Sequence, residues 1–441
     1  VCVRVHPLQP FAHCQPRSLM ALDFHPTMSP PLLATAGNDN EVKLWRMVPS
    51  GDGYSAEFVT KVASLQSTVN TVRWAPDGSC LASAGDDRCI TLIRPQADQS
   101  WEAAVEDMPT ERRLFRGHIS DVYDVCWSPD STRLFSGSVD NSCILFDAST
   151  GRMLQQFKDH SSFVQGVAWD PLDEAAVSTS CDRTVRVYRV KRPRKGTTAL
   201  PKMFQRPHTM RLAPLLPPAT AAEPAPESPS AGAGASTGLP PPPAPTPAAP
   251  APEPAEAKTV ADALVAAGPK KRRLFMDEAA PTFFRRPTWT PDGSFLLVPT
   301  GVAPPATDGS PVPATHVYTR GSWSSPCLSL PTVDGTASVA VRCSPVFYKR
   351  RRPSAADTLA DLPYRMVFAV ASIDSVTVYD TEALHPIAHV QNLHYDKLTD
   401  VAWSPDGKFL MMSSIDGYCS VVAFSDGELG EAIPSPVVKT A

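Results

Sequence analysis

Short apolar segments that alternate with polar residues recur along most of this chain, and seven of them end in the same kind of turn. Each turn has an aromatic or other apolar residue, any residue and then proline, and a second apolar segment follows it. Three copies continue with Asp-Gly, in which proline presets φ and glycine allows the positive φ of a tight hairpin. The pattern predicts seven strand–turn–strand units. The copies are Phe24-His25-Pro26, Trp74-Ala75-Pro76, Trp127-Ser128-Pro129, Trp169-Asp170-Pro171, Trp289-Thr290-Pro291, Cys343-Ser344-Pro345 and Trp403-Ser404-Pro405.

A second repeated element is an aspartate in a turn, followed by a strand that ends in an aromatic residue, as in VDNSCILF and CDRTVRVY. In three units a histidine lies 22 residues before this aspartate and nine before the turn tryptophan. Three equivalent pairs in separate units cannot converge on one catalytic or metal site. We therefore interpret them as structural His/Asp pairs: His118 with Asp140, His160 with Asp182, and His394 with Asp416.

These features resemble the hallmarks of the WD-repeat family, with Gly117-His118, the W-S-P-D turn and the terminal aromatic-Asp pairs Phe146-Asp147 and Tyr379-Asp380. The resemblance implies an all-β fold, a seven-bladed WD40 β-propeller whose four-stranded blades surround a central channel. It also implies that the histidine and aspartate of each pair hydrogen-bond within one blade.

The spacing of the turns breaks once, between Pro171 and Pro291. Residues 205–268 hold 16 prolines in 64 positions, and such a stretch buries too little apolar surface to offset its ordering entropy. We expect blades 1–4 in residues 1–204, a disordered Pro/Ala-rich insert in 205–268, blades 5–7 in 269–426 and a tail in 427–441. The last repeat supplies only three strands, so the alternating residues 1–5 are predicted to close blade 7.

The composition excludes several classes of partner and of chemistry. With 41 basic and 45 acidic residues the net charge is −4, which predicts no direct sequence-specific nucleic-acid binding. No segment approaches the roughly 20 apolar residues of a membrane span, so no membrane partner is expected. The ten cysteines form no CxxC pair, as expected for reduced thiols in an intracellular protein. HExxH and Walker motifs are missing from the sequence, and its GxSxG match, Gly234 to Gly238, lies in the Pro/Ala-rich segment. We predict no catalytic residue, metal or cofactor. A protein-binding scaffold is favoured over an enzyme.

A closer resemblance is carried by LFRGHISDVYDVCWSPD, FFRRPTWTPDGSFLLVPTG and LPYRMVFAVASIDSVTVYDT. These segments are similar to the middle, WD-repeat subunits of chromatin assembly factor 1. The resemblance implies a nuclear histone chaperone that deposits histones H3 and H4 on newly replicated or repaired DNA, with the large and small subunits of the complex as partners. Family members whose C-terminal tail carries an Arg-Arg motif have the anti-silencing-factor histone chaperone as a further implied partner. This sequence shows no such tail before Ala441.

Two alternatives stay open. The segments SAGDD and VQGVAWDP are also similar to the HIRA-type subunit of a replication-independent histone chaperone. That family carries a long second region after its propeller, whereas this sequence stops at Ala441. The other alternative is a generic WD-repeat adaptor, such as a ubiquitin-ligase substrate receptor.

One short segment allows three interpretations. Lys270, Lys271, Arg272 and Arg273 form a candidate nuclear-localisation signal, or simply solvated loop charge. The following Leu274 and Phe275 complete an R-x-L-F pattern that resembles a cyclin-docking peptide. We favour instead the burial of Leu274, Phe275, Phe283 and Phe284 at the junction of blades 4 and 5, because burying a Phe contributes roughly 1.5–3 kcal/mol.

Overall fold

The computed structural model describes residues 4–7, 17–51, 53–97, 99–103, 108–190, 208–210, 212–214, 271–304, 311–351, 359, 361–382 and 385–436. The chain divides into two compact units, residues 1–212 with 273–441, and residues 213–272. In the second unit only parts of two short strands are described, β18 (Leu212–Pro214) and β19 (Lys271–Arg273), which form a two-stranded sheet.

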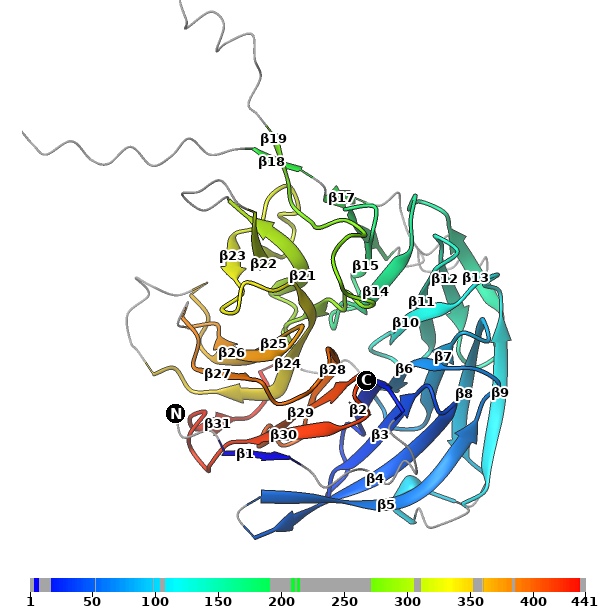
Figure 1. Cartoon of the computed structure of the whole chain (residues 1–441). Helices are drawn as coiled ribbons and strands as arrows, with labels where there is room; N and C mark the ends of the chain where they lie inside the picture. Colours follow the sequence, from blue (N-terminus) through cyan, green and yellow to red (C-terminus); the bar gives the residue numbers. More distant parts are fainter. Residues whose placement is uncertain are drawn as a thin grey trace, which may run out of the picture. The chain divides into compact units, whose positions relative to one another are not determined.

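Seven antiparallel sheets of the first unit follow one another along the chain as propeller blades (Figure 1). Blade 1 contains β2 (Leu19–Phe24), β3 (Leu32–Gly37), β4 (Glu41–Ser50) and β5 (Gly53–Ser64). Blade 2 contains β6 (Val69–Trp74), β7 (Leu81–Gly85), β8 (Cys89–Pro95) and β9 (Thr110–Arg116). Blade 3 contains β10 (Val122–Trp127), β11 (Arg133–Ser138), β12 (Cys143–Asp147) and β13 (Met153–Phe157).

The remaining blades repeat the same order. Blade 4 contains β14 (Val164–Trp169), β15 (Ala175–Ser180), β16 (Val185–Arg189) and β17 (His208–Met210). Blade 5 contains β20 (Thr288–Trp289), β21 (Phe295–Ala303), β22 (Val312–Thr319) and β23 (Leu328–Pro331). Blade 6 contains β24 (Ser338–Tyr348), β25 (Arg365–Ser372), β26 (Ser375–Asp380) and β27 (Ala388–Gln391), and blade 7 contains β28 (Leu398–Trp403), β29 (Phe409–Ser414) and β30 (Cys419–Ala423). The predicted seven-bladed all-β propeller is confirmed.

The repeated turn joins the first two strands in six of the seven blades. In blade 6 the prediction of a turn is wrong, because Cys343-Ser344-Pro345 lies inside β24 at an irregularity in its pairing with β25. In blade 2 the Gly78 N–H donates to the Ala75 carbonyl at 2.8 Å, and Gly78 has φ of +73°. A Cβ atom at Gly78 would lie 2.5 Å from the His25 ring, so the turn requires glycine for its conformation and for its packing against blade 1. Apolar side chains fill the space between neighbouring blades, as where Trp74 joins Leu32 and Val42 in one buried cluster.

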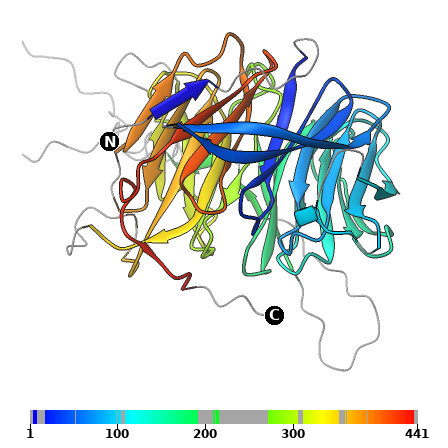
Figure 2. The same cartoon turned by 90° about the horizontal axis from the view of Figure 1, so that it is seen from below.

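The first described strand belongs to the last blade. β1 (Arg4–Pro7) pairs antiparallel with β30, with Arg4 opposite Ala423 and Pro7 opposite Ser420. Figure 2 shows β1 in dark blue beside the red strands of blade 7. The strand was expected at residues 1–5, of which residues 1–3 lie outside the described part of the chain. Blade 7 thus gains its fourth strand from the opposite end of the sequence, which joins the ends of the ring.

Two expected boundaries need correction. The fourth strand of blade 4, β17, lies inside residues 205–268, and its Met210 is buried opposite Val185. The expected insert therefore began too early, because proline frequency hid a short strand that tertiary pairing holds in place. Apart from β17 and β18, the rest of 205–268 lies outside the described residues. In the expected tail, β31 (Ala432–Ile433) pairs with β24 as a fifth strand of blade 6.

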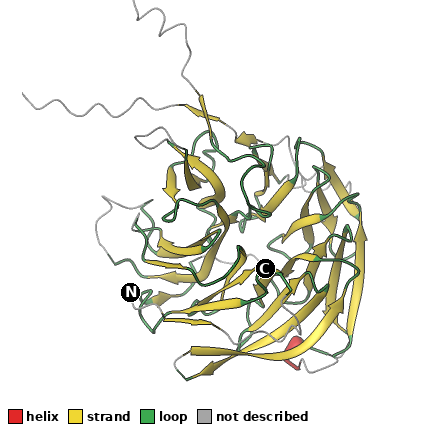
Figure 3. Ribbon diagram, in the orientation of Figure 1, coloured by secondary structure: helices red, strands yellow, loops and turns green. Residues whose placement is uncertain are grey.

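Strands and loops make up nearly all of the described structure (Figure 3). The helical element among the described residues is one short 3-10 turn, η1 (Trp101–Ala103), whose Trp101 is buried. None of the described residues forms a helix with the length and apolar character needed to cross a membrane.

Candidate protein-interaction surface

His118 connects three parts of blade 3. Its Nδ1 lies 2.9 Å from Asp140 Oδ2, and its Nε2 lies 2.8 Å from Ser136 Oγ. Asp140 also accepts hydrogen bonds from the backbone N–H of Ile119 and from the Ser142 hydroxyl. Burial opposes ionisation of Asp140, but the hydrogen bonds from His118 and Ser142 outweigh it and hold its pKa well below the ordinary value. The aspartate is therefore a fixed anion that anchors the loop before β10.

The same arrangement occurs in two other blades. In blade 4, His160 lies 2.9 Å from Asp182 and 2.7 Å from Ser178. In blade 7, His394 Nδ1 lies 3.0 Å from Asp416, but Nε2 has no hydrogen-bond partner, since Met412 stands where the other blades have serine. Burial lowers the pKa of His160 and that of His394, which favours neutral rings. The structure thus brings together all three predicted pairs.

Each pair fixes the residue that follows the histidine. The backbone N–H groups of Ile119, Ser161 and Tyr395 donate to the paired aspartates at 3.1, 3.1 and 3.0 Å. The side chains of Ile119 and Tyr395 project into solvent, with 81% and 97% of their area exposed. The His/Asp pairs therefore have a structural role that also holds exposed apolar side chains in place.

These side chains share one face of the propeller, which we call the loop face. It is formed by the loops that precede each innermost strand and by the turns between second and third strands, which lie at the same end of an antiparallel blade. Ten large apolar side chains are exposed in the described part of the chain, and six belong to the loop face. Clustered exposed apolar groups are typical of binding surfaces. The six are Ile119, Phe163, Phe283, Val333, Tyr395 and Tyr418.

Charge on the loop face is predominantly acidic. Two of its carboxylates lie near each other, and burial together with the neighbouring Asp86 raises the pKa of Asp121. Such mutual repulsion is relieved by a cationic partner. Within the described residues, and apart from the aspartates of the His/Asp pairs, the partly or fully exposed acids of this face are Asp39, Asp86, Asp87, Asp121, Asp159, Asp277, Glu278, Asp334, Asp374 and Asp396, and the bases are Arg17, Arg88, Lys158, Arg183 and Lys397.

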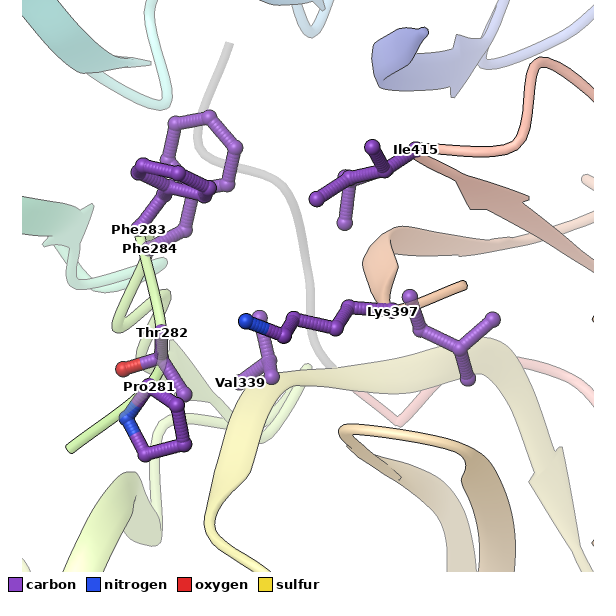
Figure 4. A pocket seen from close by; sticks show the side chains of 9 residues that line it. Pro281, Thr282, Phe283, Phe284, Val339, Lys397 and Ile415 are labelled. Atoms are coloured by element: carbon purple, nitrogen blue, oxygen red, sulfur yellow. The ribbon is translucent and has the colours of Figure 1, made fainter. Parts of the chain in front are cut away.

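A small pocket lies on the loop face between the segment entering blade 5 and the first strand of blade 7. Phe283, Phe284, Ile415 and the aliphatic stem of Lys397 are among the side chains that line it (Figure 4). Its volume of about 10 Å³ is at the lower limit for one water molecule. The pocket is therefore a shallow apolar contact point with one lysine, too small for a cofactor.

Beneath this pocket, Arg286 spans the channel. Its guanidinium donates to the backbone carbonyls of Asn70 at 2.7 Å, Thr399 at 3.1 Å and Met20 at 3.2 Å. These carbonyls belong to the innermost strands of blades 2, 7 and 1, whereas Arg286 itself precedes blade 5. One side chain therefore links four blades.

Buried charges surround Arg286. Asp400 lies 2.6 Å from Arg286, 2.8 Å from Arg73 and 3.4 Å from Arg342, and Asp124 lies 3.4 Å from Arg73. Burial opposes ionisation of Asp400, but the three arginines lower its pKa. Arg73, Asp124, Arg286 and Asp400 are buried, whereas the Arg342 side chain keeps 19% of its area exposed. They form an internal ionic network, which we call the channel network.

A signal for the channel network exists in the sequence. Asp124, Arg286 and Asp400 each stand three residues before the residue that opens the repeated turn, and Asp23, Arg73 and Arg342 each stand one residue before it. Both positions face the same side of an innermost strand, because side chains alternate with a period of two. Aligning the seven turns would have placed all six charges in the channel.

The candidate nuclear-localisation residues are placed only in part. Lys270 lies outside the described residues, Lys271 and Arg272 are described by their backbone in β19, and Arg273 is exposed. The predicted burial of Leu274, Phe275 and Phe284 is confirmed. The prediction for Phe283 is wrong, since it is 51% exposed at the channel mouth. Burial of Leu274 and Phe275 leaves the R-x-L-F pattern without the exposed side chains that peptide docking needs.

Among the described residues, the side chains that could bind a metal lie apart from one another. Within the described residues, no group of three or more His, Cys, Asp or Glu side chains could hold a metal ion. The eight described cysteines are free thiols.

The seven blades, the repeated aromatic-x-Pro turn and the His/Asp pairs define a WD-repeat β-propeller. The family model of the CAF1B/HIR1 beta-propeller domain matches residues 17–210 and 256–429, and the chain belongs to this family. It is 36% identical to the B subunit of chromatin assembly factor 1 of Mus musculus over 90% of this chain and 62% of that protein. It is 35% identical to the chromatin assembly factor 1 subunit FAS2 homolog of Oryza sativa subsp. japonica, over 93% of this chain and 71% of that protein.

Similarity to the second branch of the family is lower. Protein HIR1 of Kluyveromyces lactis is 27% identical over 91% of this chain and 41% of that protein. The predicted resemblance to chromatin assembly factor 1 subunits is confirmed at the level of the family. The chain spans less than two thirds of the length of the mouse relative.

Proposed function

We propose that this chain is the WD-repeat scaffold subunit of a histone chaperone complex of the chromatin assembly factor 1 type. In this role it acts in the nucleus, beside a large and a small subunit, in the deposition of histones H3 and H4 on replicated or repaired DNA. The proposal is supported by relatives in animals and fungi that are named as the B subunit of chromatin assembly factor 1, at 30–36% identity.

The observation that carries the proposal is the combination of acidic and exposed apolar side chains on the loop face. Histones are strongly basic, so the carboxylates supply long-range attraction and favour a cationic partner over nucleic acid. The fixed apolar side chains, Ile119 and Tyr395 among them, provide apolar surface area. A bound segment buries this area, which stabilises the complex. Binding of this kind forms and breaks no covalent bond, and the chain acts as a stoichiometric carrier without catalysis.

The HIR1-type function has weaker support. The relatives that carry this name are 26–27% identical to the chain, against 35–36% for the animal and plant chromatin assembly factor 1 subunits. None of the relatives named above points to the general adaptor function, such as that of a ubiquitin-ligase substrate receptor.

The test is a binding measurement with the complex assembled from this chain, the large and small subunits and histones H3 and H4. The double variant Ile119→Ser, Tyr395→Ser removes two exposed loop-face side chains, and we expect histone affinity to fall by roughly tenfold. Phe58→Ser on β5 is the matched control, because Phe58 is similarly exposed but lies on an outermost strand. Equal histone affinity of the double variant, the control and the unchanged protein would overturn the role of the loop face.

A further inference from the structure

β9 differs in charge from the outermost strands of the other blades. It carries Arg112, Arg113 and Arg116, all exposed, and none of the three forms an ion pair within the described part of the chain. Among outermost strands with described side chains, β5 has one basic residue, Lys61, and this lysine pairs with Glu41 at 3.1 Å. The strands β13, β17, β23 and β27 have no Lys or Arg.

The side chains of β9 divide into two sets. Phe115 is buried and its ring lies 5.7 Å from that of Phe146 in blade 3. Because side chains alternate along a strand, Arg112, Leu114 and Arg116 lie on the opposite side from Phe115. Leu114 is 54% exposed between the two arginines. One side of β9 therefore presents the order basic, apolar, basic to solvent.

Within the described residues, one backbone edge of β9 pairs with no other strand. β9 is the last strand in the order β6-β7-β8-β9, and its pairing with β8 runs from Arg116–Cys89 to Thr110–Pro95 without a register shift. The Gln96 N–H donates to the Pro109 carbonyl, which fixes the alternation of hydrogen-bonded pairs. By this alternation, the backbone hydrogen bonds to β8 are made by Glu111, Arg113 and Phe115. The backbone N–H and C=O groups of Arg112, Leu114 and Arg116 point away from the sheet.

A regular edge strand normally invites pairing with another strand, and charge is a common protection against it. Like charges on β9 repel a second copy of the same strand. The same arginines attract a strand of opposite charge, and a guanidinium can bind a carboxylate through two parallel hydrogen bonds. The surface is thus selective for an acidic partner strand.

We propose that the β9 edge is a docking site for an extended acidic segment of a partner protein, which adds to blade 2 as a fifth strand. Main-chain hydrogen bonds form to Arg112, Leu114 and Arg116, as in other cases of strand addition. The segment carries an acidic, any, apolar, any, acidic pattern, with its acidic side chains opposite Arg112 and Arg116 and its apolar side chain opposite Leu114. This site is separate from the loop face and does not depend on the function proposed above.

The probe is the fluorescein-labelled peptide Thr-Glu-Thr-Val-Thr-Glu-Thr, measured by fluorescence anisotropy with the full chain at low salt. We expect saturable binding, and loss of roughly tenfold or more in affinity for Arg112→Glu, Arg116→Glu, since two cross-strand attractions become repulsions. Arg189→Glu is the matched control, because Arg189 is an exposed arginine of blade 4, and it should bind as the unchanged protein does. Melting curves of the variants show that each is folded, and Arg112→Gln, Arg116→Gln replaces the Glu variant if that one unfolds.

Backbone pairing is tested separately. Leu114→Pro removes one outward N–H that β8 does not use, a change that edge strands tolerate, and it should abolish peptide binding while Leu114→Ala weakens it only slightly. A peptide of the same composition with its two Glu adjacent should bind poorly. Equal binding of both peptides, or full binding to Leu114→Pro, would show charge attraction without strand addition and overturn the proposal. The absence of peptide binding would also overturn the proposal. So would tighter binding of a duplex DNA than of the peptide, if that DNA binding is lost in the Arg112→Glu, Arg116→Glu variant.

Discussion

Arg286 Nη1 lies 2.6 Å from Asp400 Oδ2, which ties the segment entering blade 5 to the innermost strand of blade 7. Both side chains are fully buried. With its three backbone acceptors in blades 1, 2 and 7, Arg286 connects parts of the ring that are up to 266 residues apart in sequence. An internal ionic network therefore connects these blades across the channel.

The first prediction concerns this network. Arg286→Met should lower the free energy of unfolding by roughly 3–5 kcal/mol, because it leaves buried acceptors and a buried carboxylate without their partner. Urea unfolding followed by tryptophan fluorescence measures the change. Arg189→Met, at an exposed position, is the control and should change stability by less than about 0.5 kcal/mol. Equal midpoints for the two variants would contradict the role of Arg286.

The second prediction concerns pH. Burial raises the pKa of Asp23 from 3.8 to about 6, against the attraction of Arg73 and Arg342. A carboxyl group whose pKa is higher in the folded state stabilises the fold below its unfolded pKa, and this contribution is lost as pH rises through the folded pKa. The pH window is therefore 3.8 to about 6.

Asp23→Asn removes this titration and keeps an oxygen for the Trp74 N–H, which donates to Asp23 at 2.8 Å. We expect the unfolding free energy at neutral pH to rise by on the order of 1–3 kcal/mol. Urea titrations across the window should show a weaker pH dependence than in the unchanged protein. An identical pH profile for the two proteins would mean that Asp23 titrates as an ordinary carboxylate.

The third prediction compares two equivalent histidines. His118 bonds to both Asp140 and Ser136, whereas His394 bonds to Asp416 and leaves Nε2 without a partner. Replacement of His118 by Ala should therefore lower the melting temperature more than replacement of His394, with costs of roughly 1–3 kcal/mol and about 1 kcal/mol. Differential scanning calorimetry gives the order, and the reverse order would refute this account of the pairs.

The fourth prediction concerns the insert. Excision of residues 215–268 should leave the melting temperature nearly unchanged, because the cost of loop closure grows only logarithmically with length. Excision of 205–268 should lower it, because this also removes β17 and its buried Met210. If both deletions melt alike, β17 contributes nothing to blade 4.

Much of this fold could be predicted from local patterns. The turn residues at Trp74, Ala75 and Pro76 and their six counterparts identify the blades, because each blade is built from neighbouring segments of chain. The loop face and the channel network depend on distant contacts, such as that between Arg286 and Asn70, which a period-two pattern does not show. β17 was missed for a similar reason, since His208–Met210 is a strand only through its pairing with β16.

Phe283 and Phe284 illustrate the limit at one position. The two residues are adjacent and chemically identical, yet Phe284 contacts the Arg286 guanidinium at 3.9 Å and is buried, whereas Phe283 is exposed on the loop face. Their apolar side chains favour burial of both residues. Only the direction of the backbone at the channel mouth gives the two side chains different exposure.

The central claim is that the chain is a subunit of a histone chaperone complex. Affinity purification of the tagged chain from dividing cells, followed by mass spectrometry of the bound proteins, tests it most directly. The account predicts recovery of histones H3 and H4 with the large and small chromatin assembly factor 1 subunits. Recovery of a ubiquitin-ligase core or an RNA-processing assembly without any histone would contradict it.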